Sequence, residues 1–293
     1  MITFYELGQL GRLGNQLFQY AALKSLGLER GYEVKIPDPK TRTWHGQQCL
    51  LSNFNIESDY FTNKDLQTLS YSYSEPSHEY YDHDFLTLPD NVNISGFFQS
   101  TFYFEKHKEQ IIKELTPKEE LLDTAKVNLS KIKERFDGYE IVSLHMRRGD
   151  NTDNTDPNQV AANTSYGGNR LAEDSFYSKY FKKATSKFKN KKVKFLIFTG
   201  GKRFTDDNSE DINWCKENFS TDDFLFSEGN SSMEDFCLLT SCDHHILSHI
   251  SSFGWWASYI DKKENITVAP LKYDPETLYN YREGFYPKRW VLV

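Results

Sequence analysis

Residues 142–150 read Val-Ser-Leu-His-Met-Arg-Arg-Gly-Asp, a run in which a short apolar strand ends in charge. Because side chains alternate along a strand, His145 and Arg147 point to one side and Arg148 to the other. Ligands of open α/β sheets bind beyond the carboxyl ends of the strands, so the two guanidinium groups predict a site for an anion. A surface pair of an arginine and Asp150 at a strand end is the alternative interpretation.

Strand-like and helix-like segments alternate along the rest of the chain, which predicts an α/β protein with parallel sheets covered on both faces. The highly charged run that ends at Gly138 is the best boundary, so we expect an N-terminal domain at 1–137 and a C-terminal domain at 138–293. The expected strands after the first are 32–36, 93–98, 193–199, 245–248 and 266–269, together with one that starts at 140–141 and runs into the two arginines. The expected helices after the first are 105–115, 118–136, 175–188, 211–218, 233–242 and 253–260.

Near the start of the chain, Gly8, Gly11 and Gly14 precede a helix-like segment with Phe18 on its apolar side. The backbone N–H groups at a helix start are unpaired and carry the positive end of the helix dipole, so they favour an anion. The spacing of the glycines matches neither a dinucleotide-binding fingerprint nor a P-loop. A tight turn between the first strand and the first helix is an equally good interpretation.

A third informative segment covers residues 233–259. Glu234 and Asp235 stand in the first turn of an apolar-periodic helix, and a strand follows it. Ser251 and Ser252 then have the chemistry of a helix N-cap, which is a second place for an anion. We interpret the tryptophans of the following aromatic helix as core residues.

These three segments, at 11–21, 145–150 and 234–256, together resemble the α-1,2-fucosyltransferases of glycosyltransferase family 11. The resemblance implies a GT-B architecture, in which two Rossmann-like domains have parallel sheets facing each other across a cleft. It also implies GDP-fucose as the donor, the 2-OH of a terminal galactose as the acceptor, inversion at the fucose anomeric carbon, and neither a metal ion nor another cofactor. The N-terminal domain would bind the acceptor and the C-terminal domain the GDP-fucose.

By position in the motifs, Arg147 matches the arginine that binds the donor diphosphate, and Asp150 is the candidate near the acceptor hydroxyl. These two residues form the predicted catalytic set. The residues predicted to bind GDP-fucose are Arg12, Gly14, Asn15, His145, Arg147, Arg148, Glu234, Asp235, Ser251, Ser252 and Phe253.

The sequence also departs from the family pattern. Arg12 stands where members usually have glycine, and Gly200 and Gly201 stand where members often have two acidic residues. Gly254 replaces a serine, which we expect to be a small change.

Composition favours an enzyme without a nucleic-acid partner, because the net charge of the 293-residue chain is -7. No stretch has the length and apolarity of a membrane span, and the first residues lack the features of a signal peptide. Four cysteines, Cys49, Cys215, Cys237 and Cys242, show no paired spacing and are expected to be buried thiols. We expect a cytoplasmic enzyme, with or without peripheral attachment to the inner face of the membrane.

Three groups of residues suggest a metal site, but each of them departs from the pattern that such a site requires. Asp82 and Asp84 form a DxD tripeptide of the kind that holds a divalent ion in GT-A enzymes, but the surrounding segment lacks strand character. The acidic residues from Asp150 to Asp156 come every three residues rather than every two, so they do not match a calcium loop. The cluster of His244, His245 and His249 lacks the glutamate of a zinc helix and is interpreted as a buried strand. The histidines are expected to be mostly structural.

Three other functions remain open from the sequence. A transferase of the same architecture could use another GDP-sugar. A non-catalytic protein could bind the nucleotide or a glycan without turnover. A phosphate-ester hydrolase could use a histidine with two arginines, although the residue order of histidine phosphatases is absent.

Overall fold

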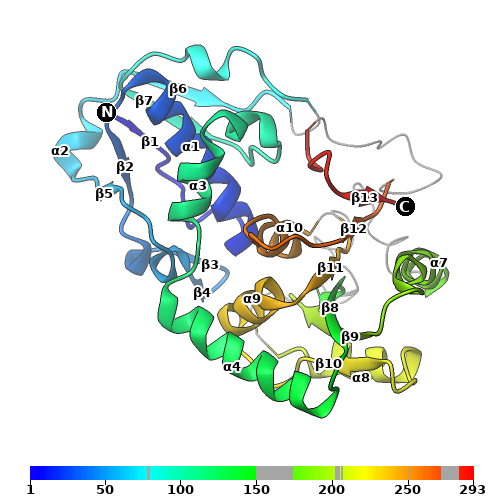
Figure 1. The fold of residues 1–293 in the computed structure, drawn as a ribbon. Coiled ribbons are helices and arrows are strands. Elements are labelled where there is room, and N and C mark those ends of the chain that lie inside the picture. Colours follow the sequence, from blue (N-terminus) through cyan, green and yellow to red (C-terminus); the bar gives the residue numbers. More distant parts are fainter. Residues whose placement is uncertain (78–79, 150–173, 202–204, 206, 250, 272–283) are drawn as a thin grey trace. The chain divides into compact units, whose positions relative to one another are not determined.

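The computed structural model describes residues 1–293 except 78–79, 150–173, 202–204, 206, 250 and 272–283 (Figure 1). The chain forms two compact units. The first contains Met1–Lys118 and Tyr281–Pro287, and the second contains Glu119–Asn280 and Lys288–Val293. Each unit has its own parallel sheet, so the expected α/β class with two Rossmann-like domains is confirmed.

The sheet of the first unit has the strand order β5-β2-β1-β7-β6, and every neighbouring pair is parallel. Its strands are β1 (Ile2–Thr3), β2 (Val34–Ile36), β5 (Asp59–Tyr60), β6 (Tyr71–Ser74) and β7 (Val92–Ser95). The α-helices are α1 (Leu13–Arg30), α2 (Asn63–Leu66) and α3 (Lys108–Glu114). A small hairpin joins β3 (Thr43–Trp44) and β4 (Gln47–Gln48). The 3-10 turns are η1 (Pro39–Thr41), η2 (Leu51–Asn53), η3 (Phe85–Thr87), η4 (Thr101–Tyr103) and η5 (Glu105–His107).

Helix α1 is the central helix of this unit. Its side chains Phe18, Ala21 and Leu26 are fully buried, as the apolar spacing predicts. A Cβ on Gly27 would lie 2.2 Å from Cγ2 of Val34, so only glycine allows the helix to pack this closely against β2. The helix ends at Gly31, which adopts the left-handed conformation with φ +67°.

The sheet of the second unit has the order β10-β9-β8-β11-β12-β13 and is also parallel throughout. Its strands are β8 (Glu140–Arg147), β9 (Val193–Gly200), β10 (Phe224–Phe226), β11 (His244–Ile246), β12 (Thr267–Ala269) and β13 (Val291–Leu292). Its helices are α4 (Glu119–Arg135), α7 (Asp174–Thr185), η7 (Ser186–Phe188), α8 (Ser209–Asn218), α9 (Ser232–Ser241) and α10 (Ser252–Tyr259).

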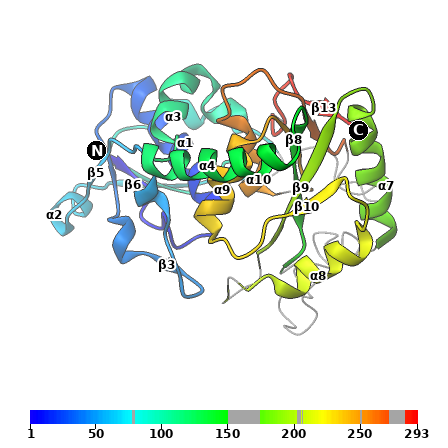
Figure 2. The same cartoon turned by 60° about the horizontal axis from the view of Figure 1, so that its bottom comes forward.

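Helices cover both faces of this second sheet. Val142, Leu144 and Met146 of β8 pack into a core with residues of α7 and α8, including Phe181 and Cys215. On the other side, α9 packs against both α4 and α10, and Figures 1 and 2 show α9 beside α4 from two directions. The sheet therefore has the two-sided cover that the alternation of strands and helices predicts.

The order of the strands defines where a ligand would bind. From β8 the chain moves to β9 and β10 on one side, and it then returns to place β11, β12 and β13 on the other side. The neighbours β8 and β11 are thus a topological switch point, and the crevice beyond their carboxyl ends is the usual binding position in open α/β sheets. In the first unit the same reversal lies between β1 and β7.

The expected domain boundary at residues 137 and 138 falls at the end of α4, whereas the two units divide at its start. Helix α4 belongs with the second unit because it packs against α9, and Lys133 Nζ lies 2.7 Å from Asp243 Oδ1. Residues near the end of the chain return to the first unit, where Phe285 stacks on Phe18 and the carbonyl of Gly284 accepts a hydrogen bond from Thr101. Contacts between segments far apart in sequence set this division.

Candidate functional site

Arg147, the arginine predicted to bind the donor diphosphate, is the last residue of β8. The backbone N–H of Arg147 donates to Oγ of Ser248, 3.0 Å away, in the segment that follows β11. This bond joins the two strand ends at the switch point of the second unit. The sequence did not single out Ser248, because only the pairing of β8 with β11 brings it to this position.

His145 lies on the same face as Arg147, against α10. Its ring centroid is 5.6 Å from that of Phe253, and a Cβ on Gly254 would lie 2.7 Å from its Nδ1. The expectation that glycine at 254 is a small change is therefore wrong in this chain, because any larger residue must displace the imidazole. Burial, together with the positive charge of Arg147, lowers the pKa of His145 to about 3. At neutral pH the imidazole is uncharged, so Arg147 is the cation on this face of β8.

Arg148 lies on the opposite face, as the alternation of side chains predicts. Its guanidinium stacks over the ring of Trp214 at 3.7 Å, and its Nε lies 3.4 Å from Oδ1 of Asp211. The other carboxylate oxygen of Asp211 accepts the N–H of Gly149 at 3.2 Å. Helix α8 therefore holds the turn that follows β8. The assignment of Arg148 to donor binding stays a prediction. Its contacts with Asp211 and Trp214 give Arg148 a structural role, because they attach the end of β8 to α8.

Asp211 is a functional candidate that sequence reasoning missed. It is only 3% exposed and contacts two residues of the motif that the sequence singled out. A carboxylate in the first turn of α8 was visible in the sequence, but its contact with the end of β8 depends on the tertiary fold.

Ser251, Ser252 and Phe253 form the start of α10, beside His145. The helix begins at Ser252, so the sequence predicted this start correctly. The side chain of Ser251 makes no capping hydrogen bond to the described part of the helix, although it is buried. The side chain of Ser251 thus does not cap the N–H groups at the start of α10, which suits an anionic ligand.

Glu234 and Asp235 occupy the start of α9, but they do different things. Oε2 of Glu234 accepts hydrogen bonds of 2.7 Å from both the backbone N–H and the hydroxyl of Ser231, which completes a capping box. Oδ1 of Asp235 accepts from Ser227 Oγ at 2.7 Å and from Asn230 Nδ2 at 3.0 Å. Burial outweighs these bonds and raises the pKa of Asp235 to about 6. Asp235 is the better candidate for a ligand hydroxyl, and both assignments stay predictions.

The glycine loop lies in the first unit, directly after β1. Gly8 and Gly11 have φ values of +87° and +88°, which only glycine adopts without strain. Arg12 is the N-cap residue of α1, and Gly14 and Asn15 stand in the first turn of that helix. Oδ1 of Asn15 accepts from Gln99 at 2.8 Å, and Gln19 donates to the carbonyls of Leu10 and Gly96.

These contacts join the glycine loop to the segment after β7, so the loop sits at the switch point of its own unit. The roles of Arg12, Gly14 and Asn15 in donor binding stay predictions. Asp150, the predicted group near the acceptor hydroxyl, lies outside the described residues, as does the acidic run to Asp156.

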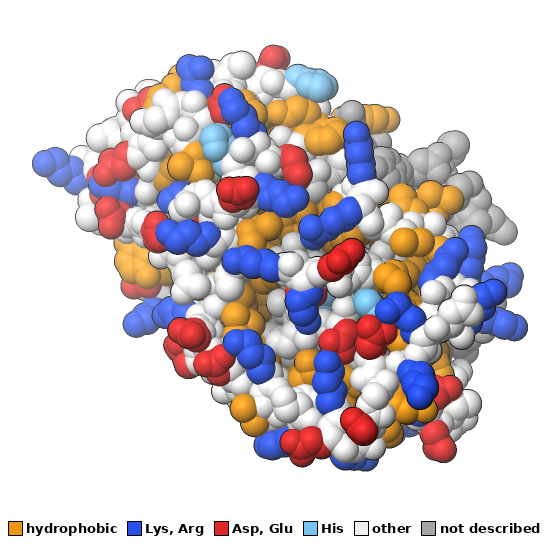
Figure 3. All heavy atoms as spheres, viewed as in Figure 1, with side chains coloured by type: hydrophobic (Ala, Val, Ile, Leu, Met, Phe, Trp, Pro, Cys, Tyr) orange, Lys and Arg blue, Asp and Glu red, His pale blue; other side chains and the backbone are white. Residues whose placement is uncertain are grey.

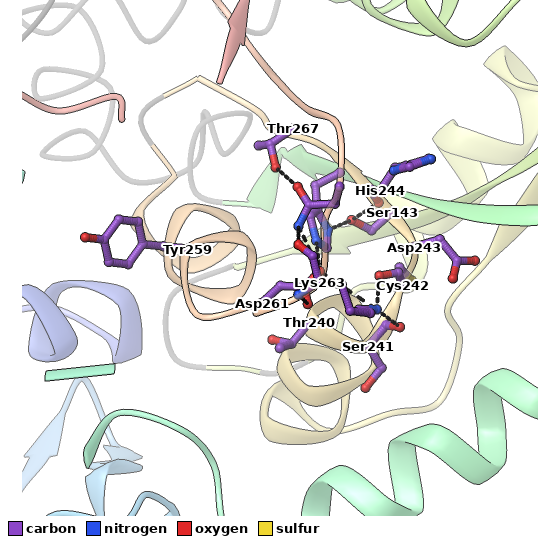
Figure 4. Close-up of polar contacts among 12 residues, drawn as sticks. Ser143, Thr240, Ser241, Cys242, Asp243, His244, Tyr259, Asp261, Lys263 and Thr267 are labelled. Carbon is purple, nitrogen blue, oxygen red and sulfur yellow. Dashed lines mark hydrogen bonds and ion pairs between the residues drawn. The ribbon is translucent and has the colours of Figure 1, made fainter. Parts of the chain in front are cut away.

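A buried polar network under β11 accounts for two of the three clustered histidines (Figure 4). Nδ1 of His245 lies 2.8 Å from Oγ of Ser143, and its Nε2 lies 3.1 Å from Oδ2 of Asp261. His244 accepts the N–H of Ile266 through Nδ1. Lys263 donates to the carbonyls of Ser241 and Cys242 at the end of α9.

Because Ser143 and His245 are 0% exposed, this network fixes the pairing of β8, β11 and β12 rather than binding a substrate. The mostly structural interpretation of these histidines is consistent with that arrangement. Within the described ranges, no group of three His, Cys, Asp or Glu side chains is arranged to hold a metal ion.

The first of the two carboxylates in the DxD tripeptide, that of Asp82, makes hydrogen bonds within the protein. Oδ2 of Asp82 accepts from the hydroxyl of Tyr73 at 2.5 Å, and its Oδ1 accepts the N–H of Asp84. All four cysteines are buried free thiols, as expected. On the face shown in Figure 3, acidic and basic side chains are intermixed over the described surface. None of the described helices is long and apolar enough to cross a lipid bilayer.

Comparison with solved structures identifies the class of fold. POFUT1 in complex with GDP-fucose superposes with a TM-score of 0.51 at 11% sequence identity, over 92% of this chain and 97% of that chain. The two α/β units with parallel sheets are those of a GT-B glycosyltransferase fold.

Sequence comparison then gives the family. The family model described as "Glycosyl transferase family 11" matches residues 2–293, so the chain belongs to this family. An alpha-1,2-colitosyltransferase of Escherichia coli is 27% identical over 97% of this chain and 96% of its own length. Galactoside alpha-(1,2)-fucosyltransferase 1 of Rattus norvegicus is 29% identical over 97% of this chain and 71% of its own.

Proposed function

We propose that this glycosyltransferase moves L-fucose from GDP-β-L-fucose to the 2-OH of a terminal galactose, with inversion and without a metal ion. The observation that carries the proposal is the end of β8 at the switch point, where Arg147 stands next to a neutral histidine and the start of α10. This arrangement suits the diphosphate of a sugar nucleotide. Membership of family 11 and the 1,2-linkages named for the two relatives support a 1,2-linkage here.

The chemistry of fucosyl transfer explains why a cation is needed there. As the bond from C1 to the phosphate oxygen breaks, negative charge develops on the β-phosphate of the leaving GDP. Preorganised donors aimed at that charge stabilise the transition state, and each is worth about 3 kcal/mol. Arg147 and the backbone N–H groups at the start of α10 would supply such donors, which is why we propose that no metal is required.

His145 has a supporting part in this proposal. Because its pKa is about 3, it adds no second positive charge and acts as a neutral hydrogen-bonding ring beside Arg147. The acceptor hydroxyl attacks from the opposite face of the sugar and loses its proton late, so a strong base is not required. We assign Asp150 to accept that hydrogen bond, on the resemblance alone.

A second candidate donor is GDP-colitose, and the Escherichia coli relative favours it, because the match covers nearly the whole of both chains. Colitose differs from fucose by hydrogen in place of the hydroxyl at C3. A site that hydrogen-bonds this hydroxyl would reject colitose strongly, by about 10⁴-fold, whereas an apolar contact would discriminate weakly. The preference between GDP-fucose and GDP-colitose therefore shows whether a hydrogen-bonding group or an apolar group of the site contacts C3 of the sugar.

The test is a donor panel with one acceptor. Purified enzyme is given GDP-fucose, GDP-colitose or GDP-mannose with lactose, and the linkage of any product is determined by NMR. We expect transfer from GDP-fucose to the galactose 2-OH. Exclusive use of GDP-colitose would replace the donor assignment but keep the reaction class. Binding of GDP with no transfer from any of the three donors would refute the proposed function.

A further inference from the structure

Residues 175–194 concentrate positive charge in a chain that is otherwise acidic. This stretch of 20 residues contains eight lysines and neither Asp, Glu nor Arg. The whole chain has a net charge of -7, so the other residues together carry -15, since the eight lysines contribute +8. An asymmetry of charge this large favours contact between the basic stretch and an anionic partner.

Four of these lysines lie on one side of a helix. Lys179, Lys182 and Lys183 of α7 are three or four residues apart, so they share one face of the helix. Lys187, in η7, comes four residues after Lys183 and continues this face. All four side chains are exposed, whereas Phe181 packs into the core of the second unit on the other side of α7. These four residues are called the lysine face.

Acidic side chains neutralise other lysines of the stretch but not the lysine face. Nζ of Lys191 lies 2.8 Å from Oε2 of Glu140, and Nζ of Lys194 lies 3.1 Å from Oδ1 of Asp223. Among the residues that the structure describes, none forms an ion pair with the lysine face. On a surface that is otherwise mixed in charge, basic side chains gather over α7 (Figures 1 and 3). The four charges are therefore available to a partner.

The end of the lysine face is remote from the predicted diphosphate site. Phe188, the residue after Lys187, lies against His244 at the start of β11, with ring centroids 5.4 Å apart. His244 pairs with Val142 of β8, and Arg147 lies five residues further along that strand. At about 3.3 Å per residue, this separation is about 17 Å. Changes at the lysine face should therefore leave the site at the end of β8 intact.

The residue types favour a lipid surface over a nucleic acid or a protein. Arginine suits specific contacts with single phosphates, whereas lysine acts as a point charge on a flexible stem, and this stretch contains only lysine. Nucleic-acid sites often stack bases on exposed aromatic rings, but the described aromatic side chains here, Tyr180, Phe181 and Phe188, are buried. Protein interfaces are depleted in lysine. A cluster of lysines is sufficient for attraction to anionic headgroups.

We propose that the lysine face docks the second unit on an anionic lipid bilayer. Because the apolar side of α7 belongs to the protein core, the helix does not insert into the bilayer, and the contact is electrostatic and reversible. Each lysine close to an anionic membrane surface strengthens binding about fivefold. The inference concerns a surface that takes no part in the proposed function, so it depends on neither the donor nor the acceptor.

The test is cosedimentation of the full chain with sucrose-loaded vesicles in about 0.1 M NaCl, where charges are screened beyond about 10 Å. One set of vesicles is phosphatidylcholine, and the other is phosphatidylcholine mixed with phosphatidylglycerol. The lysine-face variant carries Lys179→Gln, Lys182→Gln, Lys183→Gln and Lys187→Gln. The matched control removes the same net charge from exposed lysines elsewhere and carries Lys64→Gln, Lys118→Gln, Lys126→Gln and Lys131→Gln. Circular dichroism checks that both variants fold, which we expect because glutamine and lysine have similar helix propensities.

We expect the wild type to bind the mixed vesicles and not the neutral ones, and to be released by high salt. The lysine-face variant should bind the mixed vesicles at least about tenfold more weakly, while the control matches the wild type. Arginine at the same four positions keeps the charge, so that variant should bind like the wild type.

Three results would overturn the inference. The first is equal binding of the mixed vesicles by the wild type and the lysine-face variant, or no binding by either. The second is an equal loss of binding in the control, because net charge rather than the lysine face would then determine binding. The third is tighter binding of a DNA duplex than of mixed vesicles at equal phosphate concentration, because the partner would then be a nucleic acid.

Discussion

Replacing Asp235 with asparagine should change how the stability of the protein depends on pH. Burial raises the pKa of this carboxyl from 3.8 to about 6, so the folded state resists its ionisation. A difference of about 2 pKa units corresponds to at most about 3 kcal/mol. This contribution is fully present below pH 3.8, where both states are protonated. It is lost as the pH rises through about 6, because only the unfolded chain ionises freely.

The Asp235→Asn variant should keep both hydrogen bonds, since Ser227 and Asn230 both donate to Oδ1, which an amide oxygen can replace. It has no charge to ionise. Relative to the wild type, the variant should therefore gain about 2–3 kcal/mol between pH 4 and pH 7. Urea unfolding followed by tryptophan fluorescence across this range measures the difference.

Glu234→Gln is the matched control, because the neighbouring carboxyl has the opposite behaviour. The hydrogen bonds from Ser231 lower the pKa of Glu234, so its contribution to stability is present at neutral pH and is lost as the pH falls. Glu234→Gln should thus lose stability relative to the wild type as the pH rises toward 7. Stability curves of Asp235→Asn and the wild type that run parallel from pH 4 to pH 7 would refute the raised pKa of Asp235.

Three further changes test other parts of the site. Asp211→Ala removes the acceptor for Gly149 and the ion partner of Arg148, so it should cost about 3 kcal/mol of stability and lower kcat about 10- to 100-fold. Asp211→Asn should recover part of the stability and part of the kcat. Equal effects of the two variants would contradict this role of the Asp211 carboxylate. Gly254→Ala should lower the free energy of unfolding by about 1–3 kcal/mol, because the new methyl group displaces His145. Adding His145→Ala should restore this stability. A double variant that stays as unstable as Gly254→Ala would show that the methyl group clashes with another residue. Transfer should continue in excess EDTA, and a strict requirement for Mn²⁺ would reject the metal-independent mechanism.

Local patterns in the sequence predicted the parts of the fold that depend on neighbouring residues. The alternation along β8 placed Arg147 and Arg148 on opposite faces, and their contacts agree with it. The start of α10 at Ser252 followed from the serine pair. The capping role of Glu234 was not predicted, although Ser231 followed three residues later by glutamate is a capping-box signature.

Features that depend on distant contacts could not be predicted in this way. Strands as short as β5 and β13 have too few residues to show alternation, and they form because the sheet supplies a neighbouring strand. The assignment of α4 to the second unit depends on its packing against α9. Asp211 and Ser248 gain their positions from strand order, which no local pattern contains.

The central claim is that the guanidinium of Arg147 binds the diphosphate of the donor. Calorimetric titration of GDP and of guanosine into the wild type, Arg147→Ala and the exposed control Arg135→Ala tests it directly. We predict that Arg147→Ala weakens GDP binding about 10- to 100-fold, in line with loss of a charged hydrogen bond, while guanosine binding and the control are unchanged. Equal affinity of the wild type and Arg147→Ala for GDP would contradict the claim.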